Sequence, residues 1–445
     1  MGPEISTHYL NRRPSSIRSA QISFKKRSDK DSIVPINLAI GNVSLPMHPA
    51  MISRMENLKN SDSPFSEGVL RYTSSSGNEE TVKAFLNIIS YEGVNTSKLH
   101  CLITDGGSQA MEIMLLGVCG TSEKKPIMLL DPAYTNYLEF SKRLSVPIVS
   151  LSRSINNIGN FNKLNFEAIS NLVKSEKPNG LVVIPYDNPT GQFIDQTDLI
   201  KLATICVENK IWLISDEAYR QLYYDRVSSS SIWKITNKEV PNIDGFRISI
   251  ESASKVWNAC GLRIGGLITD NNLFYTKSVY EYTANLCANS LGQYIFGALA
   301  DISHEEISLW YSKQREYYLP LMNSMRDSFI KKIPGVLVSK PSAAIYLIID
   351  FKEICSPKFD ANDFIQFCAK KGCVKHNNDN YTLKPVPAPM GIGLAFVRNK
   401  VINSEQHNSC TTQSSKDIIG TPEHIACNFS ITLLISSALI ILPGL

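Results

Sequence analysis

One lysine stands among serines and an arginine in the segment Ser252-Ala-Ser-Lys255-Val-Trp-Asn-Ala-Cys-Gly-Leu-Arg263-Ile-Gly-Gly266. The segment follows a β-prone run, 246–250, and ends in two glycines that we interpret as a turn. An amine beside hydroxyls and a guanidinium suits the capture of a carbonyl compound that also carries a phosphate. A lone Ser-x-Ser-Lys is more often a surface lysine after a strand. The interpretation therefore depends on partner groups elsewhere in the chain.

Two further segments carry polar groups just beyond apolar runs. Asp216 and Tyr219 follow the run 211–214, and Asn188 begins the turn Asn188-Pro-Thr-Gly191 after another apolar run. Open α/β sheets bind ligands at the carboxyl ends of such strands. Taken singly, each segment has a structural alternative, because an Asp can cap a helix and Pro-Gly chemistry alone can make a turn.

Together these groups match the needs of one cofactor, pyridoxal 5'-phosphate (PLP). Lys255 would hold its aldehyde, and Asp216 would pair with its protonated pyridine nitrogen and keep the ring an electron sink. Asn188 and Tyr219 would donate hydrogen bonds to the phenolate O3′. The serines and Arg263 would hold the phosphate dianion.

Two upstream segments fit the same interpretation. Asp105-Gly-Gly107-Ser108-Gln109 lies between a β run and an apolar helical pattern, where backbone N–H groups at a helix start form an anion site. Tyr134 follows Asp131-Pro-Ala after the β run 127–130, and its ring can stack on the pyridine. A tyrosine packed under a loop explains the second segment equally well.

With these five segments in this order, the chain resembles the class I/II aminotransferases of the aspartate aminotransferase superfamily, the fold type I PLP-dependent enzymes. The resemblance runs from about Pro14 to about Met390. It implies that Lys255 is the Schiff-base lysine and the acid/base between Cα and C4′, assisted by Asp216 and Tyr219. The phosphate group would be bound by Gly107, Ser108, Ser252 and Arg263, with Gln109 and Ser254 beside them.

The resemblance also implies a homodimer with shared active sites. Arg71-Tyr72 resembles the segment whose tyrosine reaches the phosphate of the neighbouring subunit's cofactor. Leu38-Ala-Ile-Gly41 resembles the segment that lies over the substrate, where Gly41 leaves room for it. Asn188 would also face the substrate.

Alternating β runs and helical patterns predict an α/β fold. We expect a three-layer αβα large domain with a mostly parallel mixed sheet, plus a smaller α+β domain. Helical patterns cover 79–90, 165–174, 195–208, 271–286, 303–331 and 361–371, and two strands fall within 335–350. The expected division is an N-terminal segment 1–45, a PLP-binding domain 46–302, a small domain 303–400 entered through the long helix 303–331, and a tail 401–445.

Composition excludes little but agrees with this assignment. A net charge of +4 over 445 residues gives no indication of a nucleic-acid partner. The ten cysteines form no metal-like pairs, so we expect no metal site, reduced thiols and a cytoplasmic protein. The basic, serine-rich first thirty residues faintly suggest a transit peptide. Because Pro14-Ser-Ser-Ile-Arg18 resembles the family's opening helix, we favour a folded element there.

The resemblance weakens after Met390. Gly393 stands where the family has an arginine that grips the substrate carboxylate. Arg398 lies five positions later and would face the other side of a strand, while Lys384 offers only a point charge. Residues 402–428 are polar, and the uncharged apolar run 429–442 is short for a bilayer span. A weak membrane anchor, a packed segment and an aberrant terminus all remain open.

The sequence thus predicts a PLP-dependent aminotransferase that moves an amino group between an L-amino acid and a 2-oxo acid by a ping-pong mechanism. The resemblance suggests aspartate or an aromatic amino acid as donor. Two alternatives stay open. One is a PLP-dependent lyase or decarboxylase on the same fold, and the other is a weakly active PLP-binding protein with an altered C-terminus.

Overall fold

A seven-stranded sheet is the centre of the computed structural model, which describes residues 2–32, 43, 45–123, 125–225, 228–351, 353–355, 360–371 and 393–397. Its spatial order is β1 (His100–Asp105), β7 (Ile264–Thr269), β6 (Arg247–Ser252), β5 (Trp212–Asp216), β4 (Gly180–Val183), β2 (Ile127–Asp131) and β3 (Ile148–Ser152). Strand β7 is antiparallel to both neighbours, and the other pairs are parallel. The predicted mostly parallel mixed sheet is therefore confirmed.

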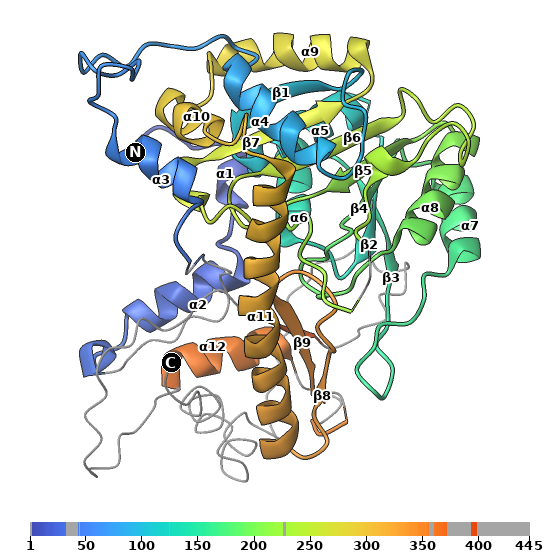
Figure 1. Ribbon diagram of the computed structural model, residues 1–445. Helices are drawn as coiled ribbons and strands as arrows, with labels where there is room; N and C mark the ends of the chain where they lie inside the picture. Colours follow the sequence, from blue (N-terminus) through green and yellow to red (C-terminus); the bar gives the residue numbers. More distant parts are fainter. Residues whose placement is uncertain are drawn as a thin grey trace.

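Helices cover both faces of this sheet, because successive strand residues point to opposite sides. Leu102, Leu129 and Val182 belong to one hydrophobic core, whereas Cys101, Met128 and Leu181 belong to the other. The first core is closed by α5 (Gly107–Cys119), α6 (Thr135–Leu144) and α9 (Asn272–Tyr282). The second is closed by α4 (Glu79–Ser90), α7 (Phe166–Glu176), α8 (Gln196–Glu208) and α10 (Ser290–Gly297). The result is the expected three-layer αβα arrangement (Figure 1).

A long helix, α11 (His304–Lys332), runs from the seven-stranded sheet to a smaller sheet (Figure 1). Its start is fixed by a capping box in which Ser303 Oγ accepts from Glu306 N at 3.2 Å. The smaller sheet has the order β10 (Gly393–Val397), β9 (Tyr346–Asp350) and β8 (Leu337–Val338). The buried stripe of α11 includes Ile307, Trp310, Tyr311, Tyr318 and Phe329, as the sequence pattern predicts for a core face.

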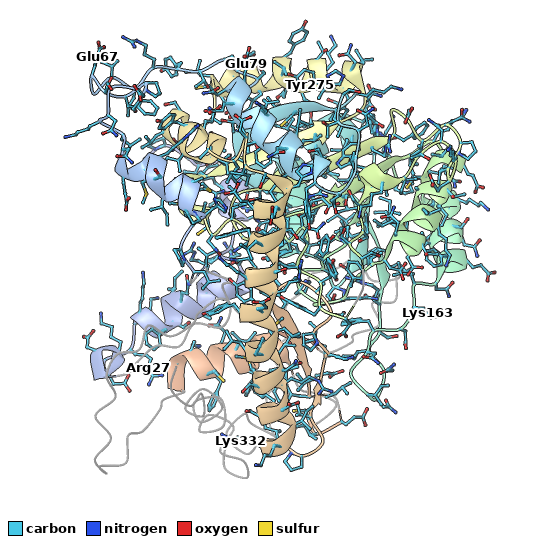
Figure 2. The ribbon with its side chains drawn as sticks, viewed as in Figure 1. Arg27, Glu67, Glu79, Lys163, Tyr275 and Lys332 are labelled. Atoms are coloured by element: carbon cyan, nitrogen blue, oxygen red, sulfur yellow. The ribbon has the colours of Figure 1, made fainter. Side chains whose placement is uncertain are left out.

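The N-terminal helix α2 (Ser16–Lys25) packs on α12 (Ala361–Lys371), beside the smaller sheet. Ser23 Oγ donates to Gln366 Oε1 at 2.9 Å across this contact. Figure 2 shows Arg27 and Lys332 at this end of the molecule, while Glu79 and Tyr275 lie at the opposite end. The remaining short helices are α1 (Thr7–Leu10), α3 (Pro49–Glu56), and the 3-10 turns η1 (Lys30–Ser32), η2 (Ile232–Lys234), η3 (Cys260–Leu262) and η4 (Thr283–Asn285).

Two local predictions need correction. Gly265 and Gly266 lie inside strand β7 rather than in a turn. A Cβ at Gly265 would lie 2.4 Å from Gly106 C and from Gly107 N, so the glycine serves a close approach of two backbones. The helical pattern 271–286 also breaks, since α9 ends at Tyr282 and a 3-10 turn follows. Within the described residues, no helix offers an apolar run long enough to cross a bilayer.

Candidate active site

The candidate site lies at one edge of the seven-stranded sheet. The carboxyl ends of β1, β5 and β6 meet there, and β7 begins there because it runs the opposite way. Asp216 at the end of β5 is level with Ile250 of β6, and Ser252 at the end of β6 is level with Gly265. The topology therefore brings Asp216, the Lys255 segment and the Asp105–Gly107 turn to the same edge, where α/β sheets bind ligands.

An anion cradle forms where β1 turns into α5. Gly106 has a φ of 77°, and a Cβ there would lie 2.3 Å from Arg263 Nη2, so the guanidinium covers this glycine. Helix α5 begins at Gly107 without a side-chain cap, which leaves its first backbone N–H groups for another acceptor. Ser252 Cβ lies 3.5 Å from the place of a Gly107 Cβ. A cation, uncapped amides and a hydroxyl on one turn suit a phosphate dianion.

The other residues predicted to bind or flank the phosphate differ in their burial and in their hydrogen bonds. Ser252 Oγ accepts from Ser254 N at 3.0 Å, and Ser254 is buried. Ser108 lies half-buried in the first turn of α5. Gln109 Oε1 accepts from Asp105 N at 2.7 Å, so this side-chain oxygen braces the turn.

Lys255 is half-buried in the turn after β6. Burial lowers the pKa of its amine, and the positive charge of Arg263 lowers it further, while Cys260 acts in the opposite direction. A lowered pKa increases the neutral fraction of the amine near pH 7. The neutral amine is the form that attacks a carbonyl carbon.

Asp216 is 6% exposed, and its carboxyl oxygens accept two hydrogen bonds. Tyr137 Oη donates to Asp216 Oδ2 at 3.0 Å, and Ala218 N donates to Oδ1 at 3.2 Å. Burial raises the pKa of Asp216 to about 6 despite these donors. Among the described residues, no cation contributes to the pKa of this carboxyl, and a cationic ring nitrogen would supply that counter-charge. Sequence reasoning missed Tyr137, although it lies three residues after Tyr134 in the same segment.

Besides Tyr137, three tyrosines lie near enough to Asp216 for its negative charge to raise their pKa, namely Tyr134, Tyr219 and Tyr346. Tyr219 Oη and Tyr346 Oη are 2.5 Å apart, and their rings meet edge to face with centroids 5.5 Å apart. Burial, reinforced by the negative charge of Asp216, raises the pKa of Tyr134 to about 12. These hydroxyls are therefore protonated at neutral pH. Sequence reasoning missed Tyr346, which comes from β9 of the smaller sheet, and no local motif marks it.

The Asn188 turn contacts the smaller sheet directly. Gly191 has a φ of 66°, and a Cβ there would lie 2.4 Å from the carbonyl oxygen of Tyr346. Ala343 N donates to Gly191 O at 2.8 Å. Asn188 precedes a cis proline and follows Asp187, whose charge contributes to the raised pKa of Asp216. The turn thus contacts the smaller sheet through Gly191 and holds Asp187 within electrostatic reach of Asp216.

Some predicted residues lie apart from this group. Tyr72 is 79% exposed, so in a single chain it faces solvent. Gly393 does not lie apart in this way, because strand β10 places it level with Tyr346 of β9. Gly41, Lys384, Arg398 and the tail 401–445 lie outside the described residues.

Comparison with known proteins identifies the family. The family model for aminotransferase class I and II matches residues 33–378. An aspartate aminotransferase from Sulfurisphaera tokodaii is 26% identical over 372 residues, which cover 82% of this chain and 84% of that protein. A probable kynurenine–oxoglutarate transaminase from Saccharomyces cerevisiae is 22% identical over 334 residues, covering 73% and 71% of the two chains.

Solved structures show the same fold. A single mutant of Thermus thermophilus aspartate aminotransferase superposes with a TM-score of 0.67 at 18% identity, covering 80% of this chain and 87% of that one. A putative kynurenine aminotransferase from Saccharomyces cerevisiae gives a TM-score of 0.68 at 17% identity, covering 83% and 88%. The family model matches more than half of the chain, so the chain belongs to the class I and II aminotransferases.

Proposed function

We propose that this protein transfers an amino group from an L-amino acid to a 2-oxo acid with PLP as cofactor. One observation carries the proposal. A half-buried lysine with a lowered pKa and a buried carboxyl stand at the ends of neighbouring strands, beside an uncapped helix start that Arg263 covers. Aldehyde capture, ring-nitrogen pairing and phosphate binding need these three features together.

The residues present fit PLP. Gly107, Ser108, Ser252 and Arg263 would hold the phosphate, and Asp216 would pair with the pyridine nitrogen. Tyr134 would lie against the ring, while Asn188 and Tyr219 would donate to O3′. When bound, PLP supplies an aldehyde for the Lys255 amine and an electron sink that makes the substrate Cα proton acidic.

The chain's own groups then have defined tasks. When the substrate is bound, the Lys255 amine would remove the proton at Cα and deliver it to C4′. Asp216 stays ionised against the ring cation and so keeps that nitrogen protonated. Tyr346 donates to or accepts from Tyr219 and holds its hydroxyl in place. The second half-reaction reverses these proton movements with a 2-oxo acid, which gives ping-pong kinetics.

The wider assignment follows from the family. The relatives named above are aspartate and kynurenine aminotransferases, which supports aspartate or an aromatic amino acid as donor and favours transfer over lyase or decarboxylase chemistry. We also propose the division into a PLP-binding domain 46–302 and a small domain 303–400. Exposed Tyr72 fits a homodimer in which it reaches the partner's phosphate site.

The test follows the cofactor's visible absorbance. An L-amino acid added to the PLP-loaded protein should bleach the absorbance of the aldehyde form, and a 2-oxo acid should restore it. Lys255→Ala should abolish turnover, whereas Lys234→Ala, at another half-buried lysine, should retain it. Product formed without any 2-oxo acid, with ammonia or CO2 released, would instead indicate a lyase or decarboxylase.

A further inference from the structure

Arg153 is a buried arginine outside the predicted site, and its contacts join two separate segments. Its side chain is 5% exposed and follows the end of β3. Nη2 donates to the carbonyl oxygens of Leu130 at 2.9 Å and Pro132 at 2.6 Å. Nη1 lies 2.7 Å from Asp187 Oδ2 and donates to Gln192 Oε1 at 3.1 Å. One guanidinium thus holds the end of β2 and both sides of the Asn188 turn.

This arginine lies where the sheet itself gives little support. Strands β2 and β4 pair only through Ile127 with Gly180 and Met128 with Leu181. Beyond these pairs the strands separate, and a cavity of about 10 Å³ lies between them, lined in part by Leu130, Val182 and Asp187. That space holds about one water at most. The guanidinium therefore satisfies carbonyls that lack a ladder partner.

Both segments lead directly to residues of the proposed site. Pro132 is two residues before Tyr134, and Asp187 immediately precedes Asn188. Asp187 also accepts a hydrogen bond from Thr190 Oγ1, so its carboxylate fixes the whole turn. The guanidinium therefore links the segment that carries Tyr134 to the segment that carries Asn188.

We propose that Arg153 is a positioning residue that sets the distance between Tyr134 and Asn188. The proposal rests on the proposed PLP function, because that function assigns both residues to the same cofactor ring. Lysine cannot replace Arg153, because a single ammonium cannot donate to the Asp187 carboxylate and to the carbonyl oxygens of Leu130 and Pro132 at the same time. With Arg153→Lys, the Asn188 turn would keep its charge partner but lose its link to β2.

Arg247→Lys is a matched control. Arg247 is buried at the start of β6, at the opposite edge of the sheet. Its Nε donates to Asp270 Oδ2 at 2.8 Å and its Nη1 to Ile235 O at 2.6 Å. Both substitutions remove a buried fork that joins a carboxylate to backbone carbonyls. A purely structural role predicts the same outcome for both.

The experiment measures PLP affinity, the pKa of the pH-dependent change in visible absorbance, and steady-state constants. A hydrogen-bond donor to O3′ stabilises the ionised form of O3′. If Asn188 is misaligned, the pKa of the absorbance change should therefore rise by about one pH unit. In Arg153→Lys we expect this rise, PLP binding weakened about tenfold, and kcat lowered about 10- to 100-fold with little change in KM. Arg247→Lys should lower the melting temperature without these effects.

Each result is decisive. Equal behaviour of the two variants, with an unshifted absorbance pKa, would overturn the positioning role while leaving the proposed function intact. Absence of PLP binding by the parent protein would end both. If Arg153→Lys does not fold, Asp187→Asn replaces it, since asparagine has nearly the same shape as aspartate but lacks the negative charge that pairs with Arg153. The same rise in the absorbance pKa is expected there, and an unchanged value would overturn the proposal.

Discussion

Replacing Tyr137 with phenylalanine removes one hydroxyl that donates to Asp216 and leaves the ring in the core. The donor is 3.0 Å from Asp216 Oδ2, and both residues are buried. A hydrogen bond to a charged acceptor contributes about 1.5–3 kcal/mol, against about 0.5–1.5 kcal/mol for a neutral pair. The hydroxyl therefore favours the ionised carboxyl by roughly 1.4 kcal/mol, which corresponds to about one pH unit in the pKa of Asp216.

The sign of the pH dependence follows from burial. Burial raises the pKa of Asp216 to about 6, whereas an aspartate in the unfolded chain titrates near 4. The folded protein without cofactor thus binds this proton more tightly, and its stability falls as pH rises from about 4 to about 6. In Tyr137→Phe this loss of stability should continue over about one further pH unit.

Urea unfolding of the cofactor-free parent and variant at fixed pH values between 5 and 8 measures this effect. The difference in unfolding free energy should be constant near pH 5, widen by about 1.4 kcal/mol between about pH 6 and 7, and level off by pH 8. Tyr186→Phe is the control, since that buried hydroxyl donates to the neutral carbonyl of Ser230 at 3.0 Å. A Tyr137→Phe difference as flat as that of the control would refute the role assigned to this hydrogen bond.

Gly106→Ala should lower both the melting temperature and PLP affinity, because the new Cβ would meet Arg263 Nη2 at 2.3 Å in a backbone conformation that alanine disfavours; a variant that titrates with PLP like the parent would argue against the cradle. Arg263→Gln should weaken PLP binding about 10- to 100-fold, as measured by equilibrium dialysis, through loss of a charge-assisted contact to phosphate. Tyr72→Phe should leave the unfolding free energy within about 0.5 kcal/mol, since the side chain is 79% exposed, yet weaken PLP binding in a dimer confirmed by sedimentation. Unchanged PLP affinity in that dimer would remove Tyr72 from the phosphate site.

Local patterns predicted the parts of the fold that local chemistry determines. The amphipathic pattern 79–90 coincides with α4, and 361–371 coincides with α12. The ends of β5 and β6 place Asp216 and the Lys255 segment together, because parallel strands end at one edge of a sheet. The same reasoning misjudged Gly265. A glycine is needed there because the backbone of Gly106 and Gly107 packs against it, not because the chain turns.

Contacts between residues far apart in the sequence could not be predicted from such local patterns. Tyr346 meets Tyr219 across 127 residues, and nothing in its own strand marks the contact. In the sequence, Arg153 is an ordinary arginine after a strand. Its contacts with both segments become apparent only in the structure, where β2 and β4 diverge after Met128 and Leu181. Helices α6 and α10 were also not predicted. Helix α10 has eight residues and buries Gly292 and Gly297, so its packing, rather than its helical propensity, determines it.

Borohydride reduction of the PLP-loaded protein, followed by mass spectrometry of its peptides, tests the central assignment most directly. Reduction would fix the cofactor on the nitrogen that holds it, and we expect the added mass on Lys255 alone. The label should be lost in Lys255→Ala and retained in Lys234→Ala. A label on any other lysine, or none on a protein that binds PLP, would contradict the account.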